Sequence, residues 1–364
     1  MAEAVAGAIR RAGNPGRSGH ALSIRSARDL FSARERLAEL FGVRDSSRFV
    51  FTGNATEALN QAIKGIVRPG DHVVTTSVEH NSVMRPLRSL EEAGVEVTVV
   101  PAGPEGSVDA AAVAKALRKG TRLVVVVHAS NVTGAIQPVG EIVRAAKHAG
   151  AFTLVDASQT AGSVPLSLSE LPADLVAAPG HKGLLGPQGT GFLYVREGVP
   201  VVPLIEGGTG TRSESDHQPD FYPDALESRT RNSVGAAGLS VSLAWLLRTG
   251  IEKIRRKETE FLEELLEGMG KIGGVIVFGP TDPSRKASAV SFLVEGMDPS
   301  ETGRRLEKRY GILVRAGLHC SPHSHRTIGT FPEGTVRVSP GPFNTRREIG
   351  SFLAALVKIA SSRR

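Results

Sequence analysis

Short apolar runs alternate with helical patterns along the first part of the chain. The runs are rich in β-branched residues and predict strands over residues 49–51, 72–75, 95–100, 123–127, 153–155 and 175–177. Between several of them, the spacing of apolar positions predicts helices over residues 55–66, 83–93, 109–118 and 139–148. Because strands that alternate with helices form mostly parallel sheets covered on both faces, this pattern predicts an α/β fold.

The pattern changes in the second part of the chain. Residues 235–270 are helical in pattern with few breaking residues, and we expect them to carry the chain out of the large domain. A smaller α/β unit follows, with expected strands over residues 275–278, 289–294 and 336–339 and helices over 301–310 and 345–360. We therefore predict a large domain over residues 14–245 and a smaller C-terminal α/β domain formed by residues 1–13 and 246–364.

Polar residues suited to chemistry follow the expected strands. Thr56, His80, Asn131, Asp156 and His181 each come after an apolar run. Ligands of open α/β sheets bind at the carboxyl ends of the strands. We therefore expect these side chains to meet at one edge of the sheet.

Lys182 and Asp156 are the most informative pair. Lys182 lies in a Gly-rich turn ahead of a β-like run over residues 191–195, and Asp156 ends the apolar run 152–155. A lysine amine forms a Schiff base with an aldehyde cofactor. An aspartate keeps a pyridinium nitrogen protonated, which makes pyridoxal phosphate (PLP) an electron sink. Each residue alone is compatible with an ordinary loop or helix cap, whereas the pair indicates a PLP enzyme.

Composition and charge narrow the possible partners. The net charge is +7 and the sequence pI is about 9.7, but basic and acidic residues are interleaved, as in residues 252–258. This mixture favours a charged surface over a nucleic-acid site. No run reaches the roughly 18 apolar residues of a membrane span. The single cysteine excludes an intramolecular disulfide, and we expect a cytoplasmic protein without nucleic-acid or membrane partners.

Longer motifs resemble a known family. The string Val155-Asp156-Ala157-Ser158-Gln159-Thr160-Ala161-Gly162, followed by Gly180-His181-Lys182, resembles the class V aminotransferases, and more narrowly their cysteine desulfurase and selenocysteine lyase branch. The Arg-Ala-Gly-Leu-His-Cys run at 315–320 looks like the cysteine loop of SUF-type desulfurases. The resemblance extends from Gly13 to Thr345. It implies the PLP-dependent transferase fold-type I: a large, mostly parallel-sheet domain, a smaller C-terminal α/β domain and a homodimer.

The resemblance also implies a cofactor site. The turn after the first strand would hold the PLP phosphate, in keeping with anion binding at helix N-termini. His80 would stack on the pyridine ring, and Thr230 would reach the phosphate of the neighbouring subunit. The full set implied for PLP is Asn54, Ala55, Thr56, His80, Asn131, Asp156, Gln159, His181, Lys182 and Thr230.

Catalysis and substrate binding are implied in the same way. Lys182, Cys320 and His80 would be catalytic, with Cys320 attacking the sulfur of PLP-bound L-cysteine to give alanine and an enzyme persulfide. A cationic neighbour favours the reactive thiolate. An arginine fork suits the substrate carboxylate. The substrate-binding residues would be Asn131, Arg315, Arg337 and His20, and an acceptor protein or thiol would collect the sulfur.

Several alternatives stay open at this point. The enzyme could act on L-selenocysteine as a lyase, be a C–S β-lyase, or catalyse another class V reaction in which Cys320 is idle. A non-catalytic binding protein with the same fold is a further alternative. His319, Cys320, His323 and His325 are also possible metal ligands, but their spacing matches no standard zinc motif, and we expect no metal.

The chain departs from the family pattern in three places. In the family, an Asp-Asn-Ala-Ala-Thr-like segment usually precedes the first helix, and this sequence does not contain it. We expect either that part of the substrate site is affected or that the start of the sequence is truncated. Arg229 and Arg231 flank Thr230 where the family has Gly before the Thr, so they would add charge to that phosphate site or obstruct it. Pro179 stands where many relatives have a hydroxyl residue, and Pro offers no donor.

Overall fold

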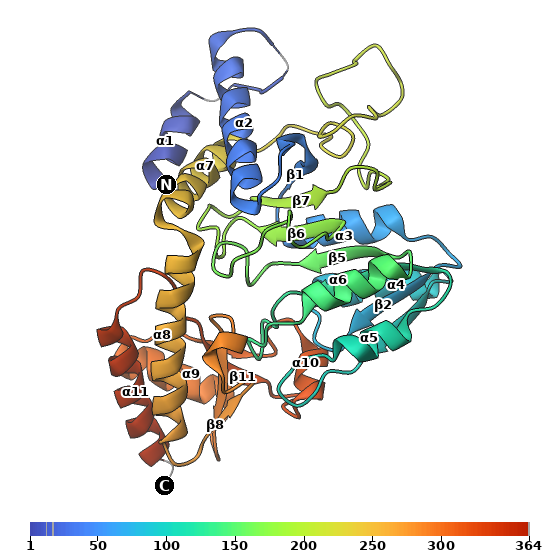
Figure 1. Cartoon of the computed structure of the whole chain (residues 1–364). Coiled ribbons are helices and arrows are strands. Elements are labelled where there is room, and N and C mark those ends of the chain that lie inside the picture. Colours follow the sequence, from blue (N-terminus) through green and yellow to red (C-terminus); the bar gives the residue numbers. More distant parts are fainter. Residues whose placement is uncertain (12, 17, 363–364) are drawn as a thin grey trace.

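The computed structural model describes residues 1–11, 13–16 and 18–362, so Arg17 of the N-terminal motif and the last two residues lie outside the described part. Figure 1 shows a large sheet with its helices and a smaller sheet beside the C-terminal helices. The strands of the large sheet are β1 (Phe49–Thr52), β2 (His72–Thr76), β3 (Glu96–Val100), β4 (Thr121–Val127), β5 (Phe152–Asp156), β6 (Leu175–Pro179) and β7 (Gly191–Val195).

The large sheet is mostly parallel, as the sequence predicts. Its strand order is β1-β7-β6-β5-β4-β2-β3. Strands β2 to β6 pair in parallel, whereas β7 runs antiparallel to both β1 and β6. The carboxyl ends of β4, β5 and β6 therefore meet at one edge of the sheet, and this edge carries the candidate site.

Both faces of this sheet are covered by helices. Along β4, Leu123 and Val125 belong to a core shared with α3 (Ala55–Ile66) and α4 (Asn81–Glu92). Val124 and Val126 belong to the opposite core, shared with α5 (Ala110–Ala116), α6 (Val139–His148), α7 (Ser233–Thr249) and α2 (Ala21–Phe41). Alternate side chains of a strand point to opposite faces, which explains why the strand is apolar throughout.

The long helical stretch is broken into two helices. Gly250 has a φ of 82° and separates α7 from α8 (Ile251–Gly270), which bend by 81° relative to each other. A left-handed φ favours glycine, so the break falls at the residue that tolerates it. No single helix among the described residues is long and apolar enough to cross a membrane, and only the bent pair α7–α8 passes that test when both helices are taken together.

The smaller sheet is antiparallel, in the order β10-β11-β9-β8. Its strands are β8 (Val275–Phe278), β9 (Val290–Val294), β10 (Arg315–Gly317) and β11 (Thr335–Val338). Its helices are α9 (Pro299–Tyr310), α10 (Pro322–Thr327) and α11 (Arg346–Ser361). Helices α8, α9 and α11 enclose with this sheet a separate apolar core around Phe292 and Phe352. Two 3-10 turns, Ser46–Arg48 and Pro283–Arg285, complete the elements.

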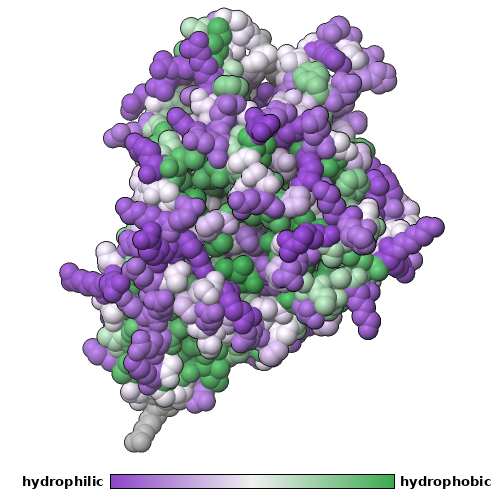
Figure 2. Space-filling view, in the orientation of Figure 1, coloured by the Kyte–Doolittle hydropathy of each residue, from purple (hydrophilic) through white to green (hydrophobic). Residues whose placement is uncertain are grey.

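The N-terminal helix lies against α7 (Figure 1). Val5 of α1 (Ala2–Arg10) faces Gly238, where an added Cβ would come within 2.7 Å of the valine side chain. The two-domain boundaries stay a prediction. On the face shown in Figure 2, hydrophilic side chains cover most of the surface, with apolar residues in scattered groups between them.

Candidate active site

A cavity of about 220 Å³ opens at the carboxyl edge of the large sheet. Every residue expected to bind PLP lines it except Thr230, and Arg315 from β10 completes its wall. The lining residues come from the N-termini of α3 and α4 and from the segments that follow β4, β5 and β6. The prediction that these side chains meet at one edge is confirmed.

Asp156 and Lys182 form the charged part of this cavity. Asp156 ends β5, is 2% exposed, and its Oδ1 accepts a hydrogen bond of 2.9 Å from the Ser158 backbone N–H. Lys182 lines the cavity, and desolvation by the cavity walls lowers the pKa of its amine. The Asp156 charge opposes this shift, whereas Arg337 and Arg315 add to it. A lowered pKa leaves more of the amine uncharged, and the uncharged amine is the form that attacks an aldehyde.

The glycines around Lys182 serve close packing. Gly183 approaches the Ala161 carbonyl so closely that an added Cβ would lie 2.4 Å from the oxygen. Gly162 has a φ of 86° and a similar approach to the Gly183 carbonyl. Only glycine fits such contacts. The Gly-rich turn therefore packs against the segment that follows Asp156, which brings the lysine and the aspartate to the same cavity.

The N-terminus of α3 forms a polar end of the cavity. Asn54 caps the helix by accepting a hydrogen bond of 3.0 Å from the Glu57 N–H, and Ala55 and Thr56 follow it along the wall. The Thr56 hydroxyl lies 2.7 Å from the Ser82 hydroxyl. Free N–H groups and hydroxyls at a helix N-terminus bind anions. Sequence reasoning missed Ser82, whose position two residues after His80 was the available signal.

His80 is the N-cap of α4. Its Nδ1 accepts a hydrogen bond of 3.0 Å from the Ser82 N–H, so the neutral ring carries its proton on Nε2. Burial lowers the pKa of His80, while Asp156 opposes and Lys182 adds to the shift. The imidazole is therefore held in its neutral form beside the cavity.

Glu79 is a buried acid that sequence reasoning also missed. Its Oε1 accepts hydrogen bonds from the Thr76 hydroxyl at 2.6 Å and the Val127 N–H at 3.0 Å, which join the ends of β2 and β4. Burial raises the pKa of this carboxyl to about 8, and the nearby Asp156 contributes in the same direction. Glu79 thus fixes the strand ends beside the cavity in its protonated form. The only sequence signal was an acid directly before His80.

This set of groups fits PLP. The buried Asp156 carboxylate suits a pyridinium nitrogen, Lys182 has an amine with a lowered pKa, and the N-terminus of α3 suits a phosphate. Pro179 lines the cavity and offers no donor, as expected. Ser158 also lines it, between Asp156 and Gln159, and supplies a hydroxyl that the sequence prediction did not include.

Cys320 lies on the β10–α10 loop, and it is exposed. Its Sγ accepts a hydrogen bond of 3.2 Å from Arg315 Nη2, and Arg315 also lines the cavity. Arg337 is the register partner of Arg315 across β10 and β11, and its Nη1 donates a hydrogen bond of 2.7 Å to the Asn131 carbonyl. Burial lowers the pKa of Arg337 to about 10. Arg315 thus links Cys320 to the cavity, and Arg337 binds Asn131, one of the residues that line it.

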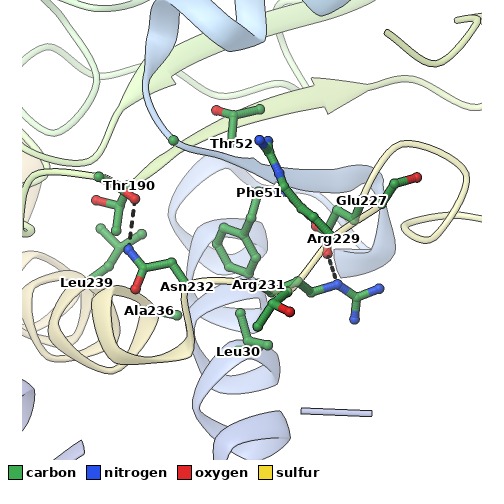
Figure 3. A pocket seen from close by; sticks show the side chains of 14 residues that line it. Leu30, Phe51, Thr52, Thr190, Glu227, Arg229, Arg231, Asn232, Ala236 and Leu239 are labelled. Carbon is green, nitrogen blue, oxygen red and sulfur yellow. Dashed lines mark hydrogen bonds and ion pairs between the residues drawn. The ribbon is translucent and has the colours of Figure 1, made fainter. Parts of the chain in front are cut away.

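Besides Cys320 and Arg337, which do not line this cavity, two further expected residues lie outside it. His20 caps α2, where its Nδ1 accepts a hydrogen bond of 3.2 Å from the Ser23 N–H. Thr230 lines a second cavity of about 220 Å³, shown in Figure 3. This cavity shares the β1–α3 turn with the first one, because Thr52 and Gly53 line the second while Asn54 begins the first.

The two arginines that flank Thr230 are paired within the chain. Arg229 forms an ion pair with Glu57 in the first turn of α3, and Arg231 pairs with Asp224 and, at 2.8 Å, with Glu227. Figure 3 shows both arginines around the second cavity. Arg229 has a φ of 106°, a backbone region that favours glycine. The departure from the family pattern therefore adds charges that local carboxylates compensate.

Two of the histidines near Cys320 have threonine hydroxyls as hydrogen-bond partners. His319 lies 3.1 Å from the Thr335 hydroxyl and His325 lies 2.7 Å from the Thr330 hydroxyl. Burial lowers their pKa values to about 3 and about 4, so both rings are neutral. In the described part of the chain, no group of three or more His, Cys, Asp or Glu residues is arranged to hold a metal ion.

Comparisons with known proteins agree with this geometry. The Aminotransferase class-V family model matches residues 4–352. A probable cysteine desulfurase of Methanothermobacter thermautotrophicus is 38% identical over 354 residues, which cover 95% of this chain and 88% of that protein. A probable cysteine desulfurase of Pyrococcus abyssi is 32% identical, with 98% of this chain and 89% of that protein covered.

Solved structures extend the comparison to the fold. The apo structure of a cysteine desulfurase from Thermococcus onnurineus has a TM-score of 0.91 at 32% identity, covering 99% of this chain and 91% of that one. A cysteine desulfurase of Escherichia coli, in an S-sulfonic acid form, has a TM-score of 0.85 at 28% identity with the same coverage. The chain therefore belongs to the class V aminotransferases, a family of typically PLP-dependent enzymes, and within it to the cysteine desulfurase-like enzymes.

Proposed function

We propose that this enzyme binds PLP through Lys182 and releases alanine from L-cysteine, with the sulfur passing to Cys320 as a persulfide. The observation that carries the proposal is the contact between the exposed Cys320 sulfur and Arg315, whose side chain also lines the Lys182 cavity. A thiol beside a guanidinium at the cavity wall is suited to attack a substrate held within.

The cofactor residues have separate tasks. Lys182 would supply the amine that holds PLP, the Asp156 carboxylate would keep its ring nitrogen protonated, and His80 would help to hold the ring. Asn54, Ala55, Thr56 and His181 would hold the phosphate, and Gln159 and Asn131 would contribute amide groups to the ring. When bound, PLP supplies an electron sink for the pair left at the substrate Cα.

The substrate residues complete the reaction. Arg337, with Arg315 and Asn131 beside it, binds the carboxylate of L-cysteine. The Lys182 amine takes the Cα proton. The Cys320 thiolate then forms an S–S bond with the substrate Sγ while the Cβ–Sγ bond breaks, and a proton added at Cβ gives the methyl group of alanine. Carbon is reduced as sulfur is oxidised to the persulfide level, so no external oxidant is needed.

We also propose a homodimer in a cytoplasmic, reducing setting. Thr230 and His20 do not line the cavity of their own chain, which supports a role in the site of a second copy. A lone exposed thiol nucleophile needs a reducing compartment to stay free. A sulfur-acceptor protein or small thiol would unload Cys320. Sedimentation analysis of the wild type and of Thr230→Ala, with PLP retention measured on each, tests the dimer.

Product analysis tests the reaction itself. The purified holoenzyme is incubated with L-cysteine, and alanine, pyruvate, ammonia and Cys320 persulfide are measured for the wild type and for Cys320→Ser. We expect alanine and persulfide from the wild type, and loss of persulfide and most alanine from the variant, because serine is a far poorer nucleophile near neutral pH.

Other products would identify other reactions. Pyruvate and ammonia would indicate C–S β-lysis. A Cys320→Ser enzyme that forms alanine from L-cysteine at the wild-type rate would contradict the role of Cys320. Activity of that variant on L-selenocysteine alone would favour a selenocysteine lyase.

A further inference from the structure

The backbone around Cys320 is held in an unfavourable conformation. His319 has a φ of 50° and Cys320 a φ of 62°, so two consecutive residues with side chains occupy the left-handed region. Such a region is disfavoured for non-glycine residues and persists only where the surrounding contacts impose it. The contacts that impose it here identify what positions the thiol.

The side-chain amide of Asn131 holds both neighbours of Cys320. Its Nδ2 donates a hydrogen bond of 2.6 Å to the His319 carbonyl, and its Oδ1 accepts one of 2.7 Å from the Ser321 hydroxyl. Asn131 is 5% exposed and Ser321 is 0% exposed, so both bonds are shielded from water. The amide thus bonds to the residue before Cys320 and to the residue after it.

These bonds connect two parts of the molecule. Asn131 follows β4 of the large sheet and lines the same cavity as Asp156 and Lys182, whereas Ser321 precedes α10 beside the small sheet. The Asn81 N–H adds a hydrogen bond of 2.9 Å to the Cys320 carbonyl from the N-terminus of α4. The position of the thiol is therefore set by the cavity wall that holds the reacting groups.

We propose that Ser321 is a positioning residue for Cys320, and that its hydroxyl, through the Asn131 amide, keeps the thiol aimed at the substrate sulfur. This inference rests on the proposed function, in which Cys320 accepts sulfur. Transfer between two sulfur atoms requires them to be close and aligned. Loss of the hydroxyl removes one of the two hydrogen bonds made by the Asn131 side-chain amide. The segment with left-handed φ angles can then relax.

Ser321→Ala tests this role, and the chain offers a matched control. Ser324 is equally buried, lies three residues further on in α10, and its hydroxyl has no hydrogen-bond partner within the described residues. Ser324→Ala therefore removes a buried hydroxyl without removing a bond. Both variants are prepared as holoenzymes. The rate of persulfide loading on Cys320 from L-cysteine is followed by mass spectrometry, and the exchange of the Cα proton of L-alanine in D2O is followed by NMR.

The two rates separate positioning from general damage. We expect Ser321→Ala to load Cys320 roughly ten- to a hundredfold more slowly, as a small misplacement of reacting atoms does. The half-saturating L-cysteine concentration and the Cα exchange should match the wild type, because Lys182 and Arg337 are untouched. Ser324→Ala should match the wild type in every measurement. In an Asn131→Ala background, Ser321→Ala should add no further loss in loading, because the bond it removes is already gone.

Three results would overturn the inference. One is wild-type loading in Ser321→Ala. Another is a loss of Cα exchange equal to the loss of loading, since the hydroxyl would then support the whole site. The third is an additive loss in the double variant. If instead the wild type itself never loads Cys320, the proposed function fails.

Discussion

Lys182 and Cys320 are held in the candidate site by supports of different kinds. The groups around Lys182 sit at strand ends and helix caps: Asp156 ends β5, and His80 and Asn54 cap α4 and α3. Cys320 sits on a loop with two consecutive left-handed residues, fixed by hydrogen bonds between Asn131 and residues 188 and 190 positions away. The first support is local in sequence and the second is not.

The two kinds of support are expected to respond differently to substitution. A strand end or an N-cap is stabilised by hydrogen bonds within a few residues, so one substitution there removes a reacting group and leaves the scaffold in place. The Cys320 loop depends on two domains keeping their relation, so changes that leave every reacting group intact are expected to affect it. The predictions below test these two halves separately.

The largest effect is expected at Lys182. Lys286 is the informative comparison, because burial lowers its pKa to about 7, yet its Nζ is enclosed and donates to the carbonyls of Thr133 and Phe278. A lowered pKa alone does not make a lysine reactive, since it also needs access. Borohydride reduction of the PLP-loaded enzyme followed by peptide mapping should therefore label Lys182 and leave Lys286 unlabelled.

Two variants complete this test. Lys182→Ala should lose the label, the visible absorbance of the loaded enzyme and turnover with L-cysteine. Lys286→Met should retain all three. Label on Lys286 in the wild type, or turnover by Lys182→Ala, would contradict the assignment of Lys182.

A smaller loss is expected for Asp156→Ala. In the proposed function, the carboxylate sets the electron demand of the cofactor ring, while the phosphate site supplies much of the anchoring. Turnover should fall about a hundredfold or more, as for other removed electrostatic partners. PLP should bind only about ten- to a hundredfold more weakly, which corresponds to one charge-assisted hydrogen bond of roughly 1.5–3 kcal/mol. Dialysis against PLP and turnover at saturating PLP measure the two effects, and near-normal turnover would exclude Asp156 as the pyridinium partner.

The helices and strands around Lys182 could be predicted closely from the sequence. The predicted helices 55–66 and 139–148 coincide with α3 and α6, and the run 191–195 coincides with β7. Periodicity and caps fix such elements. The insertion of β7, antiparallel, between β1 and β6 was not predicted, because periodicity does not encode strand order.

The Cys320 region was less predictable. β10 has three residues and α10 has six, and both contain Gly, Pro or His positions that show no regular pattern. The role of Ser321 depends on burial and on a partner from a distant segment. Glu79 was missed for the same reason, since only the fold brings its carboxyl to the Val127 N–H.

Arg337 on β11 connects the small sheet to Asn131, which follows β4 of the large sheet. We expect its substitution to have an intermediate effect on activity. Arg337→Ala should raise the L-cysteine concentration for half-maximal rate about ten- to a hundredfold, the range for loss of a hydrogen-bonded charge contact of roughly 1.5–3 kcal/mol. PLP content should stay normal. Arg305→Ala is the control, because Arg305 pairs with Glu301 on the surface of α9 and has no place in the site. An unchanged concentration dependence would show that the carboxylate is held elsewhere.

The smallest effect concerns acid stability of the Cys320 region. His319 and His325 have pKa values of about 3 and about 4 in the folded protein because of burial, with Arg337 and Arg315 adding to the shift of His319. Both lie below the unfolded value of about 6.5. The unfolded chain therefore binds more protons as the pH falls below about 6.5, and stability declines from there until the folded pKa values are reached. Above about 6.5 neither ring contributes to the pH dependence.

His325→Asn tests this directly, because its amide can keep a bond to Thr330 without titrating. Between pH 7 and pH 5 the wild type should lose more unfolding free energy in urea than the variant, by on the order of 1 kcal/mol. Persulfide loading at the same pH values locates the loss, because the Cys320 loop should weaken while exchange of the Cα proton at Lys182 persists. Equal losses of unfolding free energy in wild type and variant would show that His325 takes up its proton equally well in the folded and the unfolded protein. Burial of His325 would then contribute nothing to the pH dependence of stability.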